Sequence, residues 1–259
     1  MAPGIYIVQA YLFKSAVQAL AFDSAGNLYV ASVNSIQKFS SGAESVFAST
    51  GLSGPSGLAF DSTGNLYAAN SGNGTIEKFS SSGTDLGVFA STGLSSISGL
   101  AFDGAGNLYA ANSGNNTIEK FTPGGVGSVF ASTGLDLPSG LAFDSAGNLY
   151  AANFSGNTIS KFTPDGVGSV FASTGGNNPV GVAFDSAGNL YVANNGSWTI
   201  REFSSSGTDL GIFADGSTGL EFPWSLAFGP DIAPVPEPGT ALFGIACVGI
   251  SALRRRRRA

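Results

Sequence analysis

Histidine is absent from the 259 residues, and cysteine occurs once, as Cys247. Without histidine the chain lacks the commonest general base and the commonest metal ligand of proteins. A single cysteine cannot form an internal disulfide. Charged residues make up only 11% of the chain. We therefore expect a protein that is not an enzyme, that needs no cofactor and that is not held together by disulfides.

Basic residues are scarce outside the C-terminus. Five of the eleven form the run Arg254–Arg258. Without that run and without Glu237, 6 basic residues face 16 acidic ones, a balance of −10. A surface this acidic repels nucleic acid, so we expect no nucleic-acid partner.

The N-terminus has no basic residue before Lys14, and its apolar run is interrupted by Gln9. A secretory signal needs a basic start and a continuous apolar centre, and neither is present. The aromatic and β-branched residues of Ile5–Phe13 instead favour one or two strands. We assign residues 1–18 to N-terminal strands that close the fold, and we expect the natural start of the chain to lie upstream of Met1.

A repeated hairpin fills most of the chain. Near-copies of Phe60–Asn70 also begin at Phe22, Phe102, Phe143 and Phe184. Each copy reads as the end of one strand, a tight Asp-x-x-Gly-Asn turn and a second strand. The turn aspartates are spaced by 38, 42, 41 and 41 residues, which is the period of four-stranded propeller blades. The sequence therefore predicts an all-β propeller over residues 19–232.

The second unit shows the four expected strands at Gly57–Asp61, Asn65–Ala69, Thr75–Phe79 and Gly87–Ala90. A single blade of this kind could not bury both of its apolar faces. Blades stacked around a closed ring bury them all.

The number of blades depends on the two ends of the repeat. A sixth inner strand is expected at Ser225–Phe228, after which the turn signature fails. If it pairs with Ile5–Phe13, the two form a sixth, composite blade, so we expect six blades. Five is the alternative, because the composite blade is a strand or two short.

The pattern Pro-x-Gly-Leu-Ala-Phe-Asp-x-x-Gly-Asn-Leu-Tyr-x-Ala-Asn, followed by Thr-Ile-x-Lys-Phe, resembles the NHL-type β-propeller repeat. It is clearest at Pro55–Asn70 with Thr75–Phe79 and at Pro138–Asn153 with Thr158–Phe162, and the resemblance covers about Ala19 to Phe228. The family includes ligand binders, sensor ectodomains and a few lactonases or lyases, so the resemblance implies a fold more than a function. The acidic residue usual at the end of the second strand is replaced here by asparagine or, in the first unit, by Ser32, which weakens any metal site carried over from the family.

Two sets of polar residues recur at equivalent places in the units. The turn aspartates could face a cation as a ring, or could accept hydrogen bonds within their own turns, which we favour. The asparagines at the end of each second strand could bind sugar hydroxyls, or could close turns by bonding to the backbone. These residues are Asp23, Asp61, Asp103, Asp144 and Asp185, and Asn70, Asn112, Asn153 and Asn194.

Three aromatic residues break the repeat on the face where the asparagines are expected. Phe154 and Trp198 replace small residues in loops after the second strand, and Trp224 lies in the last loop before an inner strand. Exposed aromatic rings suit stacking on sugars or holding an apolar ligand, although packing is the commoner role. We treat these three residues, with the four asparagines, as the candidate ligand-binding set.

The C-terminus has three parts. Residues 233–239 form a proline-rich linker, residues 240–253 are an uncharged helix candidate, and residues 254–259 hold the arginine run. The apolar segment is shorter than the ~20 residues that span a bilayer comfortably, but snorkelling arginines compensate at one end. The positive-inside rule then places the arginines in the cytoplasm and the propeller outside. A nucleic-acid-binding patch would explain the arginine run but not the apolar segment beside it. A buried core helix would explain the apolar segment but would not end in five charges.

This tail resembles the PEP-CTERM sorting signal, with Val-Pro-Glu-Pro at Val235, Pro236, Glu237 and Pro238, an apolar helix and the terminal cluster Arg254, Arg255, Arg256, Arg257 and Arg258. The resemblance implies recognition by an exosortase-type membrane transpeptidase in a Gram-negative bacterium that makes extracellular polysaccharide. The chain would be anchored in the inner membrane during sorting and would then reach the cell surface or matrix.

Two functions follow. The first is a non-catalytic surface or matrix protein that binds polysaccharide or a protein partner through the face that carries the aromatic residues. The alternative is a metal-dependent hydrolase or lactonase of the six-bladed propeller kind. The sequence names neither the ligand nor the physiological role.

Overall fold

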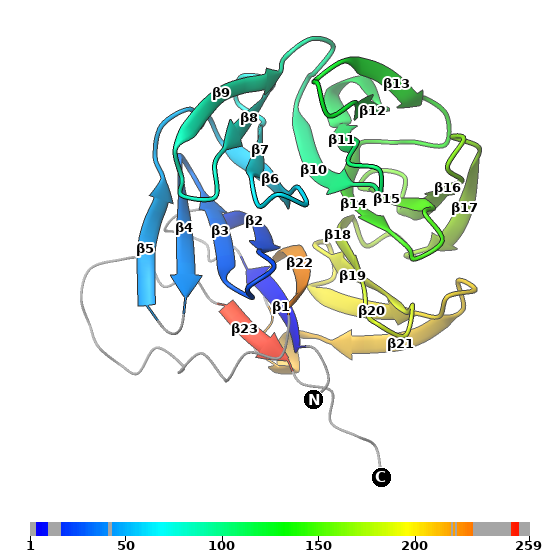
Figure 1. Ribbon diagram of the computed structural model, residues 1–259. Coiled ribbons are helices and arrows are strands. Elements are labelled where there is room, and N and C mark those ends of the chain that lie inside the picture. The colour runs from blue at the N-terminus through cyan, green and yellow to red at the C-terminus, as the bar shows by residue number, and fades with distance from the viewer. Residues whose placement is uncertain are drawn as a thin grey trace.

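The computed structural model describes residues 4–9, 17–40, 43–218, 220, 222–229 and 250–253. They form a β-propeller whose antiparallel sheets are arranged in a ring around a central axis (Figure 1). Five sheets have four strands each, in sequence order from the axis outward, and we call them the first to fifth blades. A three-stranded sheet, the closing sheet, completes the ring.

The first blade contains β2 (Val17–Phe22), β3 (Leu28–Ser32), β4 (Ser35–Ser40) and β5 (Ala43–Ala48). The second contains β6 (Pro55–Phe60), β7 (Leu66–Asn70), β8 (Thr75–Phe79) and β9 (Asp85–Ala90). The third contains β10 (Ile97–Phe102), β11 (Leu108–Asn112), β12 (Thr117–Phe121) and β13 (Gly127–Ala131), with the 3₁₀ turn η1 (Ser113–Asn115). The fourth contains β14 (Pro138–Phe143), β15 (Leu149–Asn153), β16 (Thr158–Phe162) and β17 (Gly168–Ser173). The fifth contains β18 (Pro179–Phe184), β19 (Leu190–Asn194), β20 (Thr199–Phe203) and β21 (Asp209–Ala214), followed by η2 (Gly216–Thr218).

The closing sheet corrects the expected blade number. It has the strand order β22 (Pro223–Gly229), β1 (Gly4–Gln9), β23 (Ile250–Leu253), so the described residues form five four-stranded blades rather than six. The predicted pairing of the N-terminal strand with the last inner strand is present, with Gly4 opposite Gly229. A full sixth blade does not form because no Asp-x-x-Gly-Asn turn follows β22 to supply its next strand. β22 lies between β18 and β2 and closes the ring (Figure 1).

The C-terminal prediction also needs correction where the structure describes it. Residues 250–253, expected to end a membrane-spanning helix, form strand β23, which pairs antiparallel with β1 from Ile5 opposite Leu253 to Val8 opposite Ile250. The physical reason is that an open strand edge presents unpaired N–H and C=O groups, which a short apolar segment can satisfy. Within the described residues no helix is long and apolar enough to cross a membrane. The rest of the predicted helix, the linker and the arginine run lie outside the described residues.

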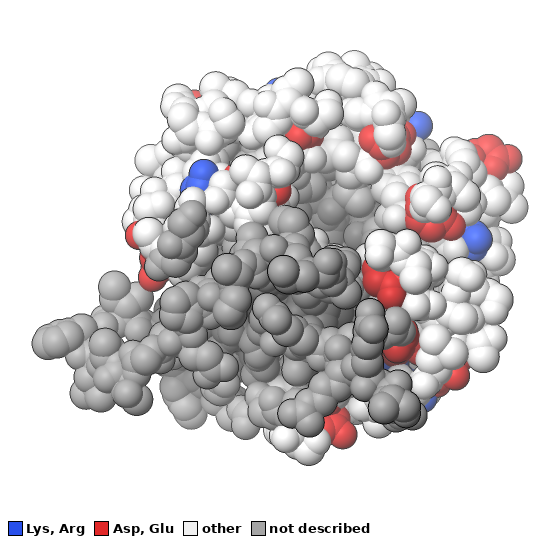
Figure 2. Space-filling model, turned by 60° about the horizontal axis from the view of Figure 1, so that its bottom comes forward, with Lys and Arg blue, Asp and Glu red and all other residues white. Residues whose placement is uncertain are grey.

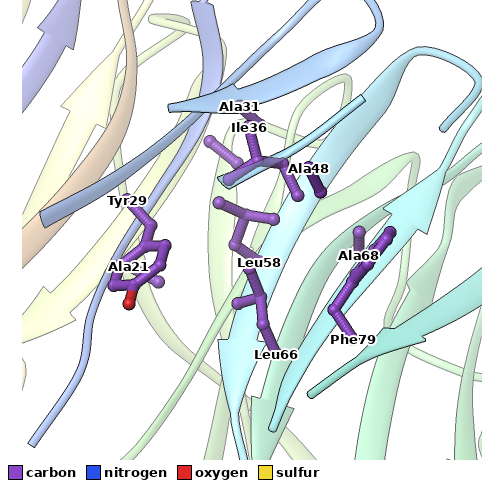
Figure 3. Close-up of a cluster of buried hydrophobic side chains, with 10 residues drawn as sticks. Ala21, Tyr29, Ala31, Ile36, Ala48, Leu58, Leu66, Ala68 and Phe79 are labelled. Atoms are coloured by element: carbon purple, nitrogen blue, oxygen red, sulfur yellow. The ribbon is translucent and has the colours of Figure 1, made fainter. Parts of the chain in front are cut away.

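The hydrophobic core lies between the blades. Figure 3 shows the contact between the first two, where Ile36 lies in one cluster with Leu58, Leu66 and Phe79, all buried. Tyr29 lies edge-on between one phenylalanine of its own blade and one of the next, with ring centroids 4.9 and 4.8 Å apart. Equivalent tyrosines repeat this bridge in the other four blades, namely Tyr67, Tyr109, Tyr150 and Tyr191. Each large side chain contributes about 1.5–3 kcal/mol when fully buried, so contacts between sheets are the main stabilising term.

Glycine is required at the axis because neighbouring inner strands approach closely. A Cβ on Gly57 would lie 1.9 Å from the carbonyl oxygen of Ser98, and one on Gly99 would lie 2.3 Å from that of Ser139. Serine hydroxyls reinforce the same contact, since Ser56 Oγ donates to Ile97 O at 2.7 Å. No side chain larger than hydrogen fits between these backbones. The tight inner ring fixes the loops that surround the mouth of the central channel.

Candidate functional site

Each turn aspartate is engaged by its own turn. Asp61 Oδ1 accepts from the backbone N–H groups of Thr63 and Asn65 at 2.9 Å, while Oδ2 accepts from Asn65 Nδ2 at 2.9 Å and from the Tyr67 hydroxyl at 3.3 Å. Burial opposes ionisation of Asp61, but these hydrogen bonds outweigh it and lower its pKa. The aspartates of the other units accept the same turn hydrogen bonds from the two residues that follow at equivalent positions. This is the turn role that the sequence favoured over a cation ring.

No group of three or more His, Cys, Asp or Glu side chains gathers anywhere in the described part of the chain.

Three of the four candidate asparagines are buried and fully used. Asn70, at 0% exposure, accepts from Ser53 N at 3.0 Å and donates to Gly51 O at 2.8 Å and to Thr75 Oγ1 at 3.1 Å. Asn112 and Asn153 make the equivalent bonds. Their amides clip the loop that leads into each blade to the end of its second strand. This geometry corresponds to the backbone-bonding role that the sequence left open.

Asn194 occupies the same position in the fifth blade but not the same state. It is also at 0% exposure, yet neither atom of its amide has a hydrogen-bond partner among the described residues. The fifth blade also differs in its third strand, where Glu202 replaces the lysine of the other blades. The carboxylate of Glu202 accepts a hydrogen bond from the Tyr191 hydroxyl at 2.9 Å. In the first, third and fourth blades that lysine lies 3.8–3.9 Å from the turn aspartate.

A cavity of about 620 Å³ occupies the channel along the axis. One level of its wall is apolar and consists of one side chain from each inner strand, namely Leu20, Leu58, Leu100, Leu141, Val182 and Leu226. A second level holds Ser56, Ser98 and Ser139, whose hydroxyls donate to backbone carbonyl oxygens of the next inner strand. Cavities of this size with an apolar wall are typical of small-molecule sites.

The predicted aromatic residues divide between the wall of the cavity and a separate aromatic pair. Phe154 and Trp224 line the cavity, and Trp224 is 43% exposed. Trp198, 39% exposed, does not line the cavity but packs on Phe222, with ring centroids 4.4 Å apart and planes at 49°. Phe222 was missed by the sequence reasoning, although its place two residues before Trp224 could have indicated it. We call these four residues the aromatic corner.

The backbone of the aromatic corner is strained. Trp198 has φ of 54° and Phe222 has φ of 42°, both in the left-handed region. The equivalents of Trp198 are Gly74, Asn116 and Asn157, which are residues that tolerate this region. A bulky residue pays on the order of 1–3 kcal/mol for such a conformation, and strain of this kind gathers at functional sites.

The charged side chains do not form a basic patch on the visible face. Figure 2 shows acidic residues distributed over several blades, with few lysines or arginines among them. This agrees with the acidic composition of the propeller.

Comparisons with known proteins agree with the fold. Residues 52–79 match the family model of the NHL repeat. No curated protein sequence matches the chain. A chain of the nidogen/laminin complex is similar to it with a TM-score of 0.78 and 21% identity over 88% of this chain and 98% of that one. Virginiamycin B lyase from Staphylococcus aureus has a TM-score of 0.67 and 15% identity over 86% and 80%, respectively.

A streptogramin B lyase is similar at a TM-score of 0.68 and 17% identity, over 82% of this chain and 74% of that one. At these identities the likeness concerns the fold alone, since one fold supports many functions. Residues 52–79 therefore carry an NHL repeat, and the chain as a whole folds as a β-propeller.

Proposed function

We propose that this protein is a non-catalytic binding or matrix protein, exported and sorted to the bacterial surface, whose propeller binds a polysaccharide or a protein partner at the aromatic corner. The proposal is carried by one observation: Trp198, at 39% exposure, packs on Phe222 from a left-handed position that the second to fourth blades fill with glycine or asparagine. The left-handed conformation itself belongs to the fold, because the equivalent residues of the second to fourth blades adopt it at both positions. What distinguishes this place is the pair of aromatic side chains there, which we explain by what the exposed ring contacts.

The chemistry of the corner suits a saccharide. Aromatic faces stack on the C–H faces of sugar rings, while a few polar groups beside them fix orientation. The channel next to the corner is walled by leucines, so a partner with an apolar group could extend into it. The channel serines already donate to carbonyl oxygens, and no histidine is present to activate a hydroxyl.

A glycan array that includes extracellular polysaccharides of Gram-negative bacteria tests this proposal. Trp198→Ala and Trp224→Ala should each weaken binding by about tenfold or more, because each removes an aromatic contact surface. Val129→Ala, at an exposed apolar residue of the outer strand β13, is the matched control and should bind as the parent does. Absence of binding to every glycan and extracellular polymer would count heavily against the proposal.

We also propose that the tail directs sorting. The support is the order of its three parts in the sequence: Val235–Pro238, the apolar segment and Arg254–Arg258. An exosortase-type transpeptidase at the inner membrane would cut near Pro236–Pro238 and pass the propeller to the cell surface or matrix. The intact mass of the exported protein tests this, because a mature form that retains the arginine run would contradict sorting.

A further inference from the structure

Four buried side-chain polar atoms have no hydrogen-bond partner among the described residues, and all of them belong to the fifth blade. They are Nδ2 and Oδ1 of Asn194, Nδ2 of Asn195 and Nε of Arg201. Buried polar groups are nearly always paired, so a cluster of exceptions calls for a cause. No such atom occurs in the described parts of the other blades.

Asn194 and Arg201 are neighbours on one face of the same hairpin. In the β19–β20 pairing Asn194 lies opposite Thr199, and Arg201 lies opposite Val192. Val192 and Asn194 are two residues apart on one strand, so their side chains share a face of the sheet. Residues directly opposite each other also share a face, so Arg201 points to the same side as Asn194. At the equivalent positions of the fourth blade, Asn153 Nδ2 and Ser160 Oγ are 2.9 Å apart.

The loop that enters the fifth blade explains why the amide is free. In the second to fourth blades this loop carries a leucine that packs on the core, at Leu52, Leu94 and Leu135. The fifth blade has Gly176 there, and a Cβ added to it would meet no atom within 4 Å. The fourth blade holds this loop as the third blade holds the preceding one, since Asn157 Oδ1 accepts from Asn178 N at 2.9 Å and Asn116 Oδ1 accepts from Leu137 N at 2.7 Å. The fifth blade thus keeps the asparagine but lacks both the clip and the leucine.

The unpaired atoms select a kind of ligand. Arg201 is already ion-paired with Asp209, so the site does not require an anion. A carboxylate could not donate to Asn194 Oδ1, and an ammonium could not accept from Arg201 Nε. A hydroxyl does both. The Nε atom itself is buried, but the side chain of Arg201 is 28% exposed as a whole, so a hydroxyl reaches Nε when the outer part of this side chain moves aside.

We propose that the fifth blade contains a saccharide subsite in which one sugar hydroxyl donates to Asn194 Oδ1 and accepts from Arg201 Nε. Trp198, in the turn between these two residues, supplies with Phe222 an aromatic surface for the C–H face of the sugar. This subsite rests on the function proposed above and assigns it to a neutral saccharide. A peptide amide also combines a donor with an acceptor, but the adjoining exposed ring stack favours the sugar.

Titration calorimetry on the full chain tests the subsite, with dextran, cellohexaose and chitohexaose as neutral probes, a galacturonate hexamer as the acidic probe and an asparagine-rich peptide as the amide probe. At least one neutral probe should bind. Asn194→Leu removes the amide, and Arg201→Lys keeps the charge beside Asp209 but removes the Nε donor. Each should weaken binding about tenfold or more. Asn115→Leu, at an exposed asparagine of the third blade, is the matched control and should leave binding unchanged.

The outcomes separate the two proposals. If a neutral probe binds the parent and both fifth-blade variants equally, while Trp224→Ala loses it, the subsite is overturned and the aromatic corner stands; this is also the result expected if the unpaired atoms only hold water. Binding of the acidic probe alone or of the peptide alone overturns the assignment to a neutral saccharide. If no probe binds, the neutral-saccharide subsite fails, whereas the aromatic corner is decided by the glycan array. Circular dichroism of each variant confirms that it is folded before titration.

Discussion

The second to fourth blades and the fifth blade share one sequence pattern but differ in how completely it is used. In the earlier three, each asparagine amide is saturated, each entry loop is anchored by a leucine, and each turn before the third strand has Gly or Asn at its left-handed position. In the fifth blade the amide is unpaired, the leucine is glycine, and the left-handed position holds Trp198. The repeat shows what the fold needs, so its departures mark residues kept for another purpose.

The largest expected difference concerns the glycines at the axis. Gly99→Ala would place a Cβ 2.3 Å from the Ser139 carbonyl oxygen, whereas at Gly181 the nearest atom would be 3.1 Å away. Overpacking against backbone cannot be relieved by a rotamer change, so Gly99→Ala should lower the free energy of unfolding by about 3 kcal/mol or more. Gly181→Ala should cost about 1 kcal/mol. Urea denaturation measures both, and equal losses would contradict the closer packing of the earlier blades.

A second contrast compares the two kinds of asparagine. Asn112→Leu breaks bonds of 2.7 Å to Ser95 N and 2.8 Å to Gly93 O and should destabilise the protein by about 2–3 kcal/mol. Asn194→Leu breaks no bond among the described residues and removes an unpaired buried amide, so its effect should lie within about 1 kcal/mol of zero and could be stabilising. Thermal and urea unfolding without ligand measure both. A large loss for Asn194→Leu would show that its amide has a structural partner.

Much of this comparison could be predicted from the sequence because the hairpin is locally encoded. The Asp-x-x-Gly-Asn turn carries its own hydrogen-bonding residues, and the third strand of the second blade was predicted with its observed bounds, Thr75–Phe79. The state of Asn194 could not be predicted, because the second strand that it ends, Leu190–Asn194, keeps the pattern of the other blades. The hydrogen-bond partners of its amide would come from the loop that enters the blade, some twenty residues earlier. In that loop the sequence differs visibly at Gly176, which replaces the leucine of the second to fourth blades.

The closing sheet was only partly predictable for a related reason. Both of its pairings join residues more than 200 positions apart, but that of β1 with β22 follows from ring closure, whereas no pattern in the sequence encodes that of β1 with β23. An apolar segment near a charged end has the same composition whether it forms a helix or fills a strand edge. The difference is decided by the unpaired edge of β1.

The third contrast concerns pH. The second blade carries Glu77 and Asp85 at the positions where the fifth blade carries the ion pair of Arg201 and Asp209. Burial, then the hydrogen bond and charge of Asp85, raise the pKa of Glu77 to about 7. Because the folded state holds this proton more tightly than the unfolded state, its contribution to stability is complete below about pH 4.5 and declines as the pH rises towards 7.

The free energy of unfolding should therefore fall by roughly 1–2 kcal/mol between pH 5 and pH 8. Glu77→Gln removes the titrating group and should flatten this slope. Four turn aspartates do not interfere, because their lowered pKa values place their loss of stability below pH 4; they are Asp23, Asp61, Asp103 and Asp144. Denaturant midpoints measured across the range check the sign. A slope that persists in Glu77→Gln would assign the effect to another group.

The smallest effect on stability, and the sharpest on function, is expected at Trp198. Trp198→Asn restores the residue found at this turn in the third and fourth blades and relieves its left-handed strain, but it loses the packing on Phe222. These changes oppose each other, so the free energy of unfolding should change by less than about 1 kcal/mol while saccharide binding is lost. The reciprocal Asn157→Trp in the fourth blade brings in the strain without the Phe222 contact and should destabilise by about 1–2 kcal/mol without creating binding. If Trp198→Asn proves strongly destabilising, the tryptophan belongs to the packing of the closing sheet, and its strain serves the ring rather than a ligand.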